Sequence, residues 1–326
     1  MKVIVTGAAG FIGFHVCQRL LHRGDQVLGV DDLNDYYDPA LKQARLDQLA
    51  EHKSFQFNRV DVSDIEAMGQ LFAAHHDTTH VVHLAAQAGV RYSLINPYAY
   101  IHANVMGQLA MLEASRGLAD LRNFVYASSS SVYGGNTKLP FSVQDRVDHP
   151  VSLYAATKRA GELIAECQTK LYDFPAVGLR FFTVYGPWGR PDMAAYIFTK
   201  AIFEGQPIRV FNKGDMRRDF TYIDDIVDGV LASLSSPPPE ATGQARHRVY
   251  NLGNHRSEEL THFIEILEAA CGREAIKDYA DMQPGDVKAT FADIEDSRRD
   301  LGFEPRVTIE EGLPRFVNWY RKYHKV

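Results

Sequence analysis

The stretch that decides the fold is residues 2–32, KVIVTGAAGFIGFHVCQRLLHRGDQVLGVDD. A β-branched apolar run at Lys2–Val5 leads into a turn with three glycines, after which the spacing of apolar residues predicts a helix. A second strand pattern, Gln26–Val30, ends in Asp31 and Asp32. Such glycines let the backbone approach a pyrophosphate at the positive end of a helix, and the acid accepts ribose hydroxyls. The stretch therefore predicts a dinucleotide site, and the acids favour NAD because they would repel the 2′-phosphate of NADP.

Strand and helix patterns continue to alternate downstream of this unit. Further strands are expected at Phe55–Val60, His80–Leu84, Asn123–Ala127 and Ala176–Phe181. This alternation is typical of an α/β fold with a Rossmann-like, doubly wound parallel sheet. From Thr183 onward the alternation breaks up. We therefore expect residues 1–182 to form the NAD-binding domain, and residues 183–326 to form mainly a smaller substrate-binding lobe with some segments returning to the main domain.

Composition and net charge limit which binding partners and which cellular compartment are expected. The net charge of −6 argues against a nucleic-acid surface. No apolar run of 18 or more residues is present, so no membrane span is expected. Cys17, Cys167 and Cys271 lie far apart without metal-ligand spacing, which predicts buried free thiols and no metal site. A soluble cytoplasmic protein is the expectation.

Tyr154 and Lys158 lie four residues apart in SLYAATKRAGE, residues 152–162. On a helix they share one face. A phenol has a pKa of about 10, and a nearby ammonium lowers it. Taken alone, the pair is far more typical of an ordinary amphipathic helix. The upstream cofactor site and a hydroxyl at Ser129 favour an acid/base pair.

The Gly-x-x-Gly-x-x-Gly spacing and the Tyr-x-x-x-Lys pair resemble the extended short-chain dehydrogenase/reductases. RFFT, YGP and RRDF further resemble the nucleotide-sugar epimerases and dehydratases within that superfamily. The nearest resemblance is to the UDP-glucuronate 4-epimerase group, and it spans essentially the whole chain. Its motifs are AGVRYS at 88–93, SSSSVYGGN at 128–136, LRFFTVYGPWGRPDMA at 179–194 and QPGDV at 283–287. Lys288 departs from the group, which usually has a proline there.

The resemblance implies roles for individual residues. Ser129 would hydrogen-bond the substrate, Tyr154 would act as acid/base, and Lys158 would orient the cofactor and lower the pKa of the tyrosine. By sequence, Ser128 or Ser130 could fill the hydroxyl role as well. The implied NAD contacts are Gly7, Gly10, Phe11, Ile12, Gly13, Asp31, Asp32, Asp61, Val62, Leu84, Ala85, Ala86, Tyr154 and Lys158.

The implied substrate is a UDP-sugar. Its diphosphate would be bound by Arg190 and Arg218, because arginine suits phosphate oxygens. Thr183, Ser130 and Arg91 are alternative partners for the uronate carboxylate. The full set of expected substrate contacts is Arg91, Ser128, Ser130, Thr183, Arg190, Arg218 and Asp286.

The predicted reaction is the NAD-dependent 4-epimerisation of UDP-glucuronate to UDP-galacturonate through a 4-keto intermediate. The related dehydratases have an Asp-Glu pair before the VYG motif and the decarboxylases have a Glu, whereas this chain has serines there. The alternatives are a UDP-glucose 4-epimerase, a UDP-glucuronate decarboxylase and a non-catalytic NAD sensor. Family relatives also predict a homodimer through helices at residues 94–116 and 153–172.

Overall fold

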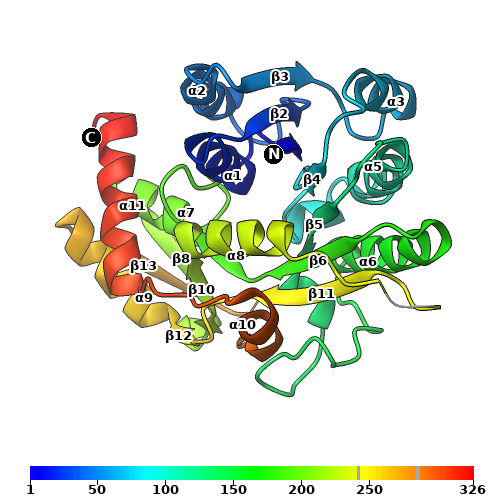
Figure 1. Ribbon diagram of the computed structural model, residues 1–326. Helices are drawn as coiled ribbons and strands as arrows, with labels where there is room; N and C mark the ends of the chain where they lie inside the picture. The colour runs from blue at the N-terminus through cyan, green and yellow to red at the C-terminus, as the bar shows by residue number, and fades with distance from the viewer. Residues whose placement is uncertain (241–242, 283–286) are drawn as a thin grey trace.

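Seven parallel strands form the central sheet of the chain (Figure 1). The structure, a computed structural model, describes residues 1–240, 243–282 and 287–326. The strand order is β11-β6-β5-β4-β1-β2-β3. The strands are β1 (Lys2–Thr6), β2 (Gln26–Asp31), β3 (Phe55–Arg59), β4 (His80–His83), β5 (Asn123–Ser129), β6 (Ala176–Phe181) and β11 (His247–Leu252). The predicted Rossmann-like parallel fold is confirmed.

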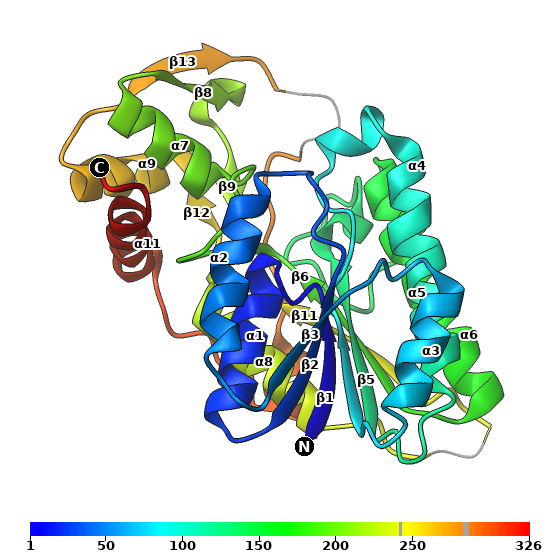
Figure 2. The ribbon, with the colours of Figure 1, turned by 90° about the horizontal axis from the view of Figure 1, so that it is seen from above.

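The inner strands are buried along most of their length because helices cover both faces of the sheet. Val3, Ile4 and Val5 of β1 are fully buried, as expected for a parallel strand covered on both sides. One face is covered by α1 (Phe11–His22), α2 (Pro39–Ala50) and α8 (Ile223–Ser235). The other is covered by α3 (Ile65–Ala74), α5 (Gly107–Ser115) and α6 (Leu153–Tyr172), as Figure 2 shows.

The helical segment before β5 differs from the single long helix that the sequence suggests. It consists of α4 (Pro97–Tyr100), a π-helical turn at Ile101–Met106 and then α5. Short 3-10 turns occur at Arg91–Leu94 and at Ser130–Tyr133. π-helical turns often occur at functional sites, where they redirect one side chain. Here the turn contains Asn104.

The second half of the chain builds a lobe beyond the carboxyl ends of the strands (Figure 2). The lobe contains three small two-stranded sheets, β10-β7, β12-β9 and β13-β8. Its strands are β7 (Thr183–Tyr185), β8 (Pro207–Phe211), β9 (Arg217–Arg218), β10 (Phe220–Tyr222), β12 (Glu258–Glu259) and β13 (Ile276–Ala280). Its helices are α7 (Ala194–Glu204), α9 (Leu260–Cys271) and α11 (Ile309–His324), while α10 (Glu295–Leu301) packs against α8 and β11.

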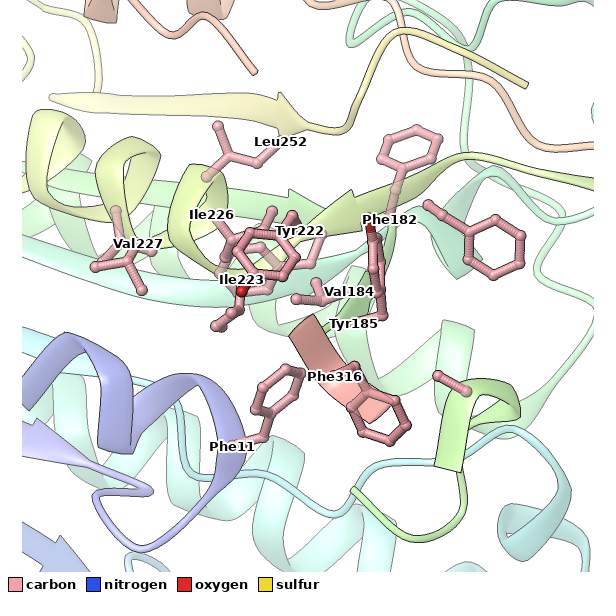
Figure 3. Close-up of a cluster of buried hydrophobic side chains, with 14 of the residues drawn as sticks. Phe11, Phe182, Val184, Tyr185, Tyr222, Ile223, Ile226, Val227, Leu252 and Phe316 are labelled. Atoms are coloured by element: carbon pink, nitrogen blue, oxygen red, sulfur yellow. The ribbon is translucent and has the colours of Figure 1, made fainter. Parts of the chain in front are cut away.

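The lobe and the sheet share one buried core. Figure 3 shows Phe11 of α1 and Phe316 of α11 together with Tyr185, Ile223 and Leu252. These five side chains come from both halves of the chain and are each less than a tenth exposed. The segments that connect the two halves are therefore packed against side chains of both halves. This packing is relevant to the loop that contains Arg190.

The cysteines are free, but they are not all buried. Cys17 and Cys271 are buried as predicted, whereas Cys167 is exposed on α6. The expectation of three buried thiols is therefore wrong for Cys167. Among the described residues, no helix has both the length and the apolar character that a membrane crossing needs.

Candidate active site

Tyr154 lies in the first turn of α6, beside the carboxyl end of β5. Ser152 caps this helix, and its Oγ accepts a hydrogen bond from the Ala155 backbone N at 3.1 Å. The cap fixes where the helix begins. Lys158 follows one turn later on the same face, as predicted from the spacing.

The Ser129 side chain lies next to the Tyr154 phenol and acts on its pKa as a hydrogen-bonding partner. Burial raises the pKa of Tyr154, while the Ser129 hydrogen bond and the charge of Arg190 act to lower it. Asp192 acts in the opposite direction to Arg190. The structure therefore brings two of the predicted catalytic side chains, Ser129 and Tyr154, into direct contact.

Lys158 is buried and hydrogen-bonded to the backbone of β5. Its Nζ donates to the Ala127 carbonyl O at 2.9 Å, and the side chain is 8% exposed. Burial lowers the pKa of Lys158 to about 8, against the opposing charge of Glu162. Arg190 is a cation that acts to lower the pKa of Tyr154 in this structure. The expectation that Lys158 lowers it as well stays a prediction.

Asn104 ties the active-site helix to the strand-end loop after β4. Its Oδ1 accepts from Gln87 N at 2.8 Å, and its Nδ2 donates to Gln87 O at 3.0 Å. The same Nδ2 donates to Thr157 Oγ1 at 3.1 Å. Thr157 Oγ1 in turn donates to the Tyr154 carbonyl O. The π-helical turn thus places a buried amide that fixes the first turn of α6.

The three serines at the end of β5 face different surroundings. Ser129 Oγ accepts from Ser131 N at 3.1 Å and is available to Tyr154. Ser128 Oγ donates to Glu162 Oε1 at 2.6 Å. Ser130 begins the 3-10 turn that follows β5. The structure therefore places Ser129 beside Tyr154 and turns Ser128 toward a buried carboxylate.

The glycine turn has the shape that a diphosphate needs. Gly7 has φ +70°, and a Cβ added there would lie 2.8 Å from Ala85 N. A Cβ on Gly13 would lie 2.0 Å from the Gly7 carbonyl O. Gly10 is the N-cap of α1 and makes no side-chain cap bond, so the helix begins with backbone amides that can bind an anion. These residues fit a dinucleotide cofactor.

The acids after β2 lie at the edge of this turn. Asp31 is buried, and its carboxylate accepts from Ala9 N at 3.2 Å and from Leu33 N at 2.9 Å. Burial raises the pKa of Asp31, while Lys42, 3.8 Å away, acts to lower it. The Asp32 carboxylate accepts from Asn34 N at 3.0 Å.

Most of the remaining predicted cofactor residues lie at neighbouring strand ends, and Phe11 and Ile12 lie at the start of α1. Asp61 Oδ1 accepts from Ser63 N at 2.8 Å, in the turn after β3. Thr6 Oγ1 accepts from Ala85 N at 3.1 Å and so holds the segment after β4 against β1. The others expected here were Phe11, Ile12, Val62, Leu84 and Ala86, of which Phe11 and Val62 are buried and the other three are half-buried.

The predicted substrate-binding residues lie in different parts of the structure. Arg190 makes a bidentate ion pair with Asp192, at 2.9 and 2.6 Å. Thr183 and Arg190 both line a small cavity of the lobe. The Arg91 guanidinium lies 4.8 Å from the ring centroid of Phe211. Arg218 Nη1 donates to the carbonyl oxygens of Arg217 and Lys288, and Asp286 lies outside the described residues.

A buried ion pair behind the active site was not anticipated from the sequence. Arg180 Nε and Nη2 donate to Glu162 at 2.8 and 2.9 Å, and both side chains are at most 3% exposed. Glu162 is four residues beyond Lys158 and eight beyond Tyr154, so it continues the same stripe of α6. This spacing is the sequence signal from which the position of Glu162 could have been predicted.

Comparison with known proteins gives a consistent result. Residues 3–253 match the sequence profile of the NAD dependent epimerase/dehydratase family. UDP-glucuronate 4-epimerase 4 of Arabidopsis thaliana is 48% identical, over 99% of this chain and 76% of the relative. UDP-glucuronic acid 4-epimerase of Bacillus cereus, solved with UDP-glucuronic acid and NAD, is 35% identical with a TM-score of 0.90, over 99% and 100% of the two chains. UDP-glucose 4-epimerase of Thermotoga maritima, solved with UDP-glucose, is 30% identical with a TM-score of 0.88, over 99% and 100%.

Proposed function

This chain belongs to the NAD-dependent epimerase/dehydratase family and its cofactor is NAD, and we propose that it interconverts UDP-glucuronate and UDP-galacturonate. The observation that carries the proposal is the Ser129–Tyr154 contact at the end of β5, within a serine run that has no carboxylate. The similarity to UDP-glucuronate 4-epimerases along nearly the whole chain supports it. In this proposal residues 1–182 bind NAD and residues 183–326 mainly bind the UDP-sugar.

Tyr154 is the proposed proton carrier. Its hydroxyl takes the proton of the C4 hydroxyl of the sugar and later returns one to the C4 oxygen. The phenolate needed for the first step is favoured by the Ser129 hydrogen bond and by Arg190, which both act against burial on the pKa of Tyr154. NAD, when bound, supplies the carbon that takes up and gives back a hydride. Lys158 is proposed to hold the nicotinamide ribose, and with a pKa of about 8 it is mostly an ammonium at pH 7.

The proposal also requires that the 4-keto sugar undergo no further chemistry. A ketone at C4 makes the C5 proton acidic, and a carboxylate base would remove it. The Glu162 carboxylate is hydrogen-bonded to Arg180 and Ser128, and the Asp192 carboxylate is hydrogen-bonded to Arg190. The serine run supplies hydroxyls only, so the ketone is reduced again and the product is inverted at C4.

We assign the choice of substrate to side chains that would contact the sugar and the diphosphate. Arg190 and Arg218 are the proposed ligands of the diphosphate, and Asp286 is proposed to contact the substrate as well. Ser130, Thr183 and Arg91 are the proposed alternatives for the carboxylate. Ser128 supports this role less well, because its hydroxyl donates to Glu162.

A direct comparison of two substrates tests this assignment. We expect UDP-glucuronate to be turned over with a kcat/KM about tenfold to 100-fold above that of UDP-glucose, because donors placed for a carboxylate lose their charged partner with the neutral sugar. Initial rates with each substrate, with products identified by NMR, give the ratio. Equal values, or a preference for UDP-glucose, would assign the chain to the neutral-sugar epimerases instead.

A homodimer is proposed through α4, the π-helical turn and α6. Leu94, Ile95 and Tyr98 are between 72% and 81% exposed, and Leu163 of α6 is 50% exposed. α4 and α6 are in contact, and exposed apolar side chains on neighbouring helices can form such an interface. Leu112, which also lies in the predicted 94–116 segment, is fully buried within the chain.

Sedimentation velocity at micromolar concentration tests the dimer. The chain should sediment as a dimer, and Ile95→Glu should shift it toward the monomer because the new carboxylate would have to be buried unpaired. Tyr279→Glu, at an exposed position of β13 in the lobe, is the matched control. A monomeric wild-type chain would contradict the proposal.

A cytoplasmic location is also proposed. The three cysteines are free, and two of them are buried in the core. Free thiols persist in reducing compartments.

A further inference from the structure

The loop that contains Arg190, residues 186–193, is held by side chains from the cofactor half of the molecule. His15 of α1 donates from Nε2 to the Pro187 carbonyl O at 2.9 Å. Arg45 of α2 donates from Nη2 to the Trp188 carbonyl O at 2.7 Å. Two consecutive carbonyls of this loop are thus fixed by two helices of the cofactor half, α1 and α2.

Arg45 also binds the glycine turn itself. Its Nη1 donates to the Ala9 carbonyl O at 2.7 Å and to the Tyr37 hydroxyl at 2.7 Å. The side chain is fully buried. Burying a guanidinium is costly unless its hydrogen bonds are made. One planar group therefore joins the turn that receives the dinucleotide to a loop more than 140 residues away.

His15 is a neutral donor in this arrangement. Burial lowers its pKa to about 4, against the opposing hydrogen bond to Pro187. The ring therefore carries a single proton at pH 7. Since a carbonyl oxygen only accepts, that proton must be on Nε2.

The loop needs this support because its conformation is unusual. Trp188 has φ +62°, a left-handed conformation that non-glycine residues rarely adopt. Its indole packs against Phe14 of α1 and Trp319 of α11, with ring centroids 5.6 and 5.3 Å away. Trp188 therefore packs against side chains from both halves of the molecule.

The charge of Arg190, two residues further on, acts to lower the pKa of Tyr154. Its bidentate partner Asp192 accepts from the Tyr36 hydroxyl at 3.2 Å. Tyr36 belongs to the segment after β2, so a third bond ties the loop to the cofactor half. The position of Arg190 depends on how the loop is anchored.

We propose that His15 and Arg45 are positioning residues that hold Arg190 beside Tyr154, and that Arg45 couples this loop to the glycine turn through Ala9. The proposal rests on the proposed function only for the role of Arg190 as a ligand of the UDP-sugar. It adds two residues with no expected contact to the sugar. It also predicts that substrate affinity depends on groups next to the cofactor site.

Binding of UDP to NAD-saturated protein, measured by calorimetry, tests the proposal. His15→Phe keeps an aromatic ring between Phe11 and Phe14 but removes the bond to Pro187. We expect UDP to bind about tenfold more weakly and KM to rise more than kcat falls, while NAD content is unchanged. Arg45→Met should weaken UDP binding similarly and should also reduce NAD retention. Arg19→Met, at a surface ion pair of α1, should change neither.

A double-mutant comparison separates positioning from general damage. If His15 acts through Arg190, adding His15→Phe to Arg190→Met should weaken UDP binding by less than about twofold further. Additive losses, or unchanged UDP binding in His15→Phe, would overturn the proposal. Thermal unfolding shows whether each variant folds, and if Arg45→Met does not, His15→Phe decides the question. UDP binding does not depend on turnover, so failure to epimerise UDP-glucuronate would refute the proposed function without touching this inference.

Discussion

Tyr154→Phe should lower kcat by about 10²–10⁴-fold, the usual contribution of a general acid/base group. The substitution removes one oxygen and leaves the ring, which packs edge-on against Tyr100 with centroids 6.0 Å apart. The helix cap at Ser152 and the Asn104 bridge do not involve this oxygen. The chain should therefore stay folded and should retain NAD.

Steady-state rates with UDP-glucuronate, together with NAD released on denaturation, measure both effects. Tyr98→Phe is the matched control, because Tyr98 is 81% exposed and should tolerate the change. A Tyr154→Phe enzyme within about threefold of the wild-type rate would remove Tyr154 from the mechanism.

Glu162→Gln should lower the free energy of unfolding by about 3–5 kcal/mol, because it leaves the Arg180 guanidinium buried without its countercharge. Arg180 is 3% exposed, and two of its nitrogens donate to Glu162. The same substitution replaces the acceptor of the Ser128 hydroxyl. Equilibrium unfolding in urea measures the loss, and Glu166→Gln, at an exposed position of α6, should change stability by less than about 0.5 kcal/mol.

The pH dependence of this pair has a definite sign. Burial acts to raise the pKa of Glu162, but Arg180, Ser128 and Arg159 outweigh it and leave the pKa lowered. A carboxyl whose pKa is lower in the folded than in the unfolded chain contributes stability above its unfolded value of about 4.3. That contribution should be lost as the pH falls through the lowered folded pKa. A loss below 1 kcal/mol in Glu162→Gln, unchanged with pH, would show that the pair is energetically neutral.

Local sequence signals predicted the elements that form the cofactor half. The apolar runs of the inner strands, the glycine spacing and the acid after Val30 each act over a few residues, so they can be recognised without tertiary contacts. The helix that places Tyr154 and Lys158 on one face was predicted for the same reason. The contact between Ser129 and Tyr154 joins a strand end to a helix start, and it followed from the resemblance rather than from spacing.

Contacts between distant segments could not be predicted in this way. From the sequence, Arg45 would be expected to be an ordinary charged residue of α2. It is instead fully buried and donates a hydrogen bond to the Trp188 carbonyl O. The direction of the Lys158 ammonium toward Ala127 likewise depends on where β5 lies beside α6. The amide of Asn104, in the π-helical turn, is hydrogen-bonded to both Gln87 and Thr157. Each of these is a tertiary interaction that overrides a local pattern.

We propose that this enzyme inverts C4 of UDP-glucuronate and changes nothing else. The most direct measurement is turnover of UDP-glucuronate deuterated at both C4 and C5 in ordinary water, with the product analysed by mass spectrometry and NMR. The account predicts UDP-galacturonate that retains both deuterium atoms, because the C4 hydride returns to the same carbon and no base removes the C5 proton. Loss of the C5 deuterium at the turnover rate, or a UDP-pentose as the main product, would contradict it.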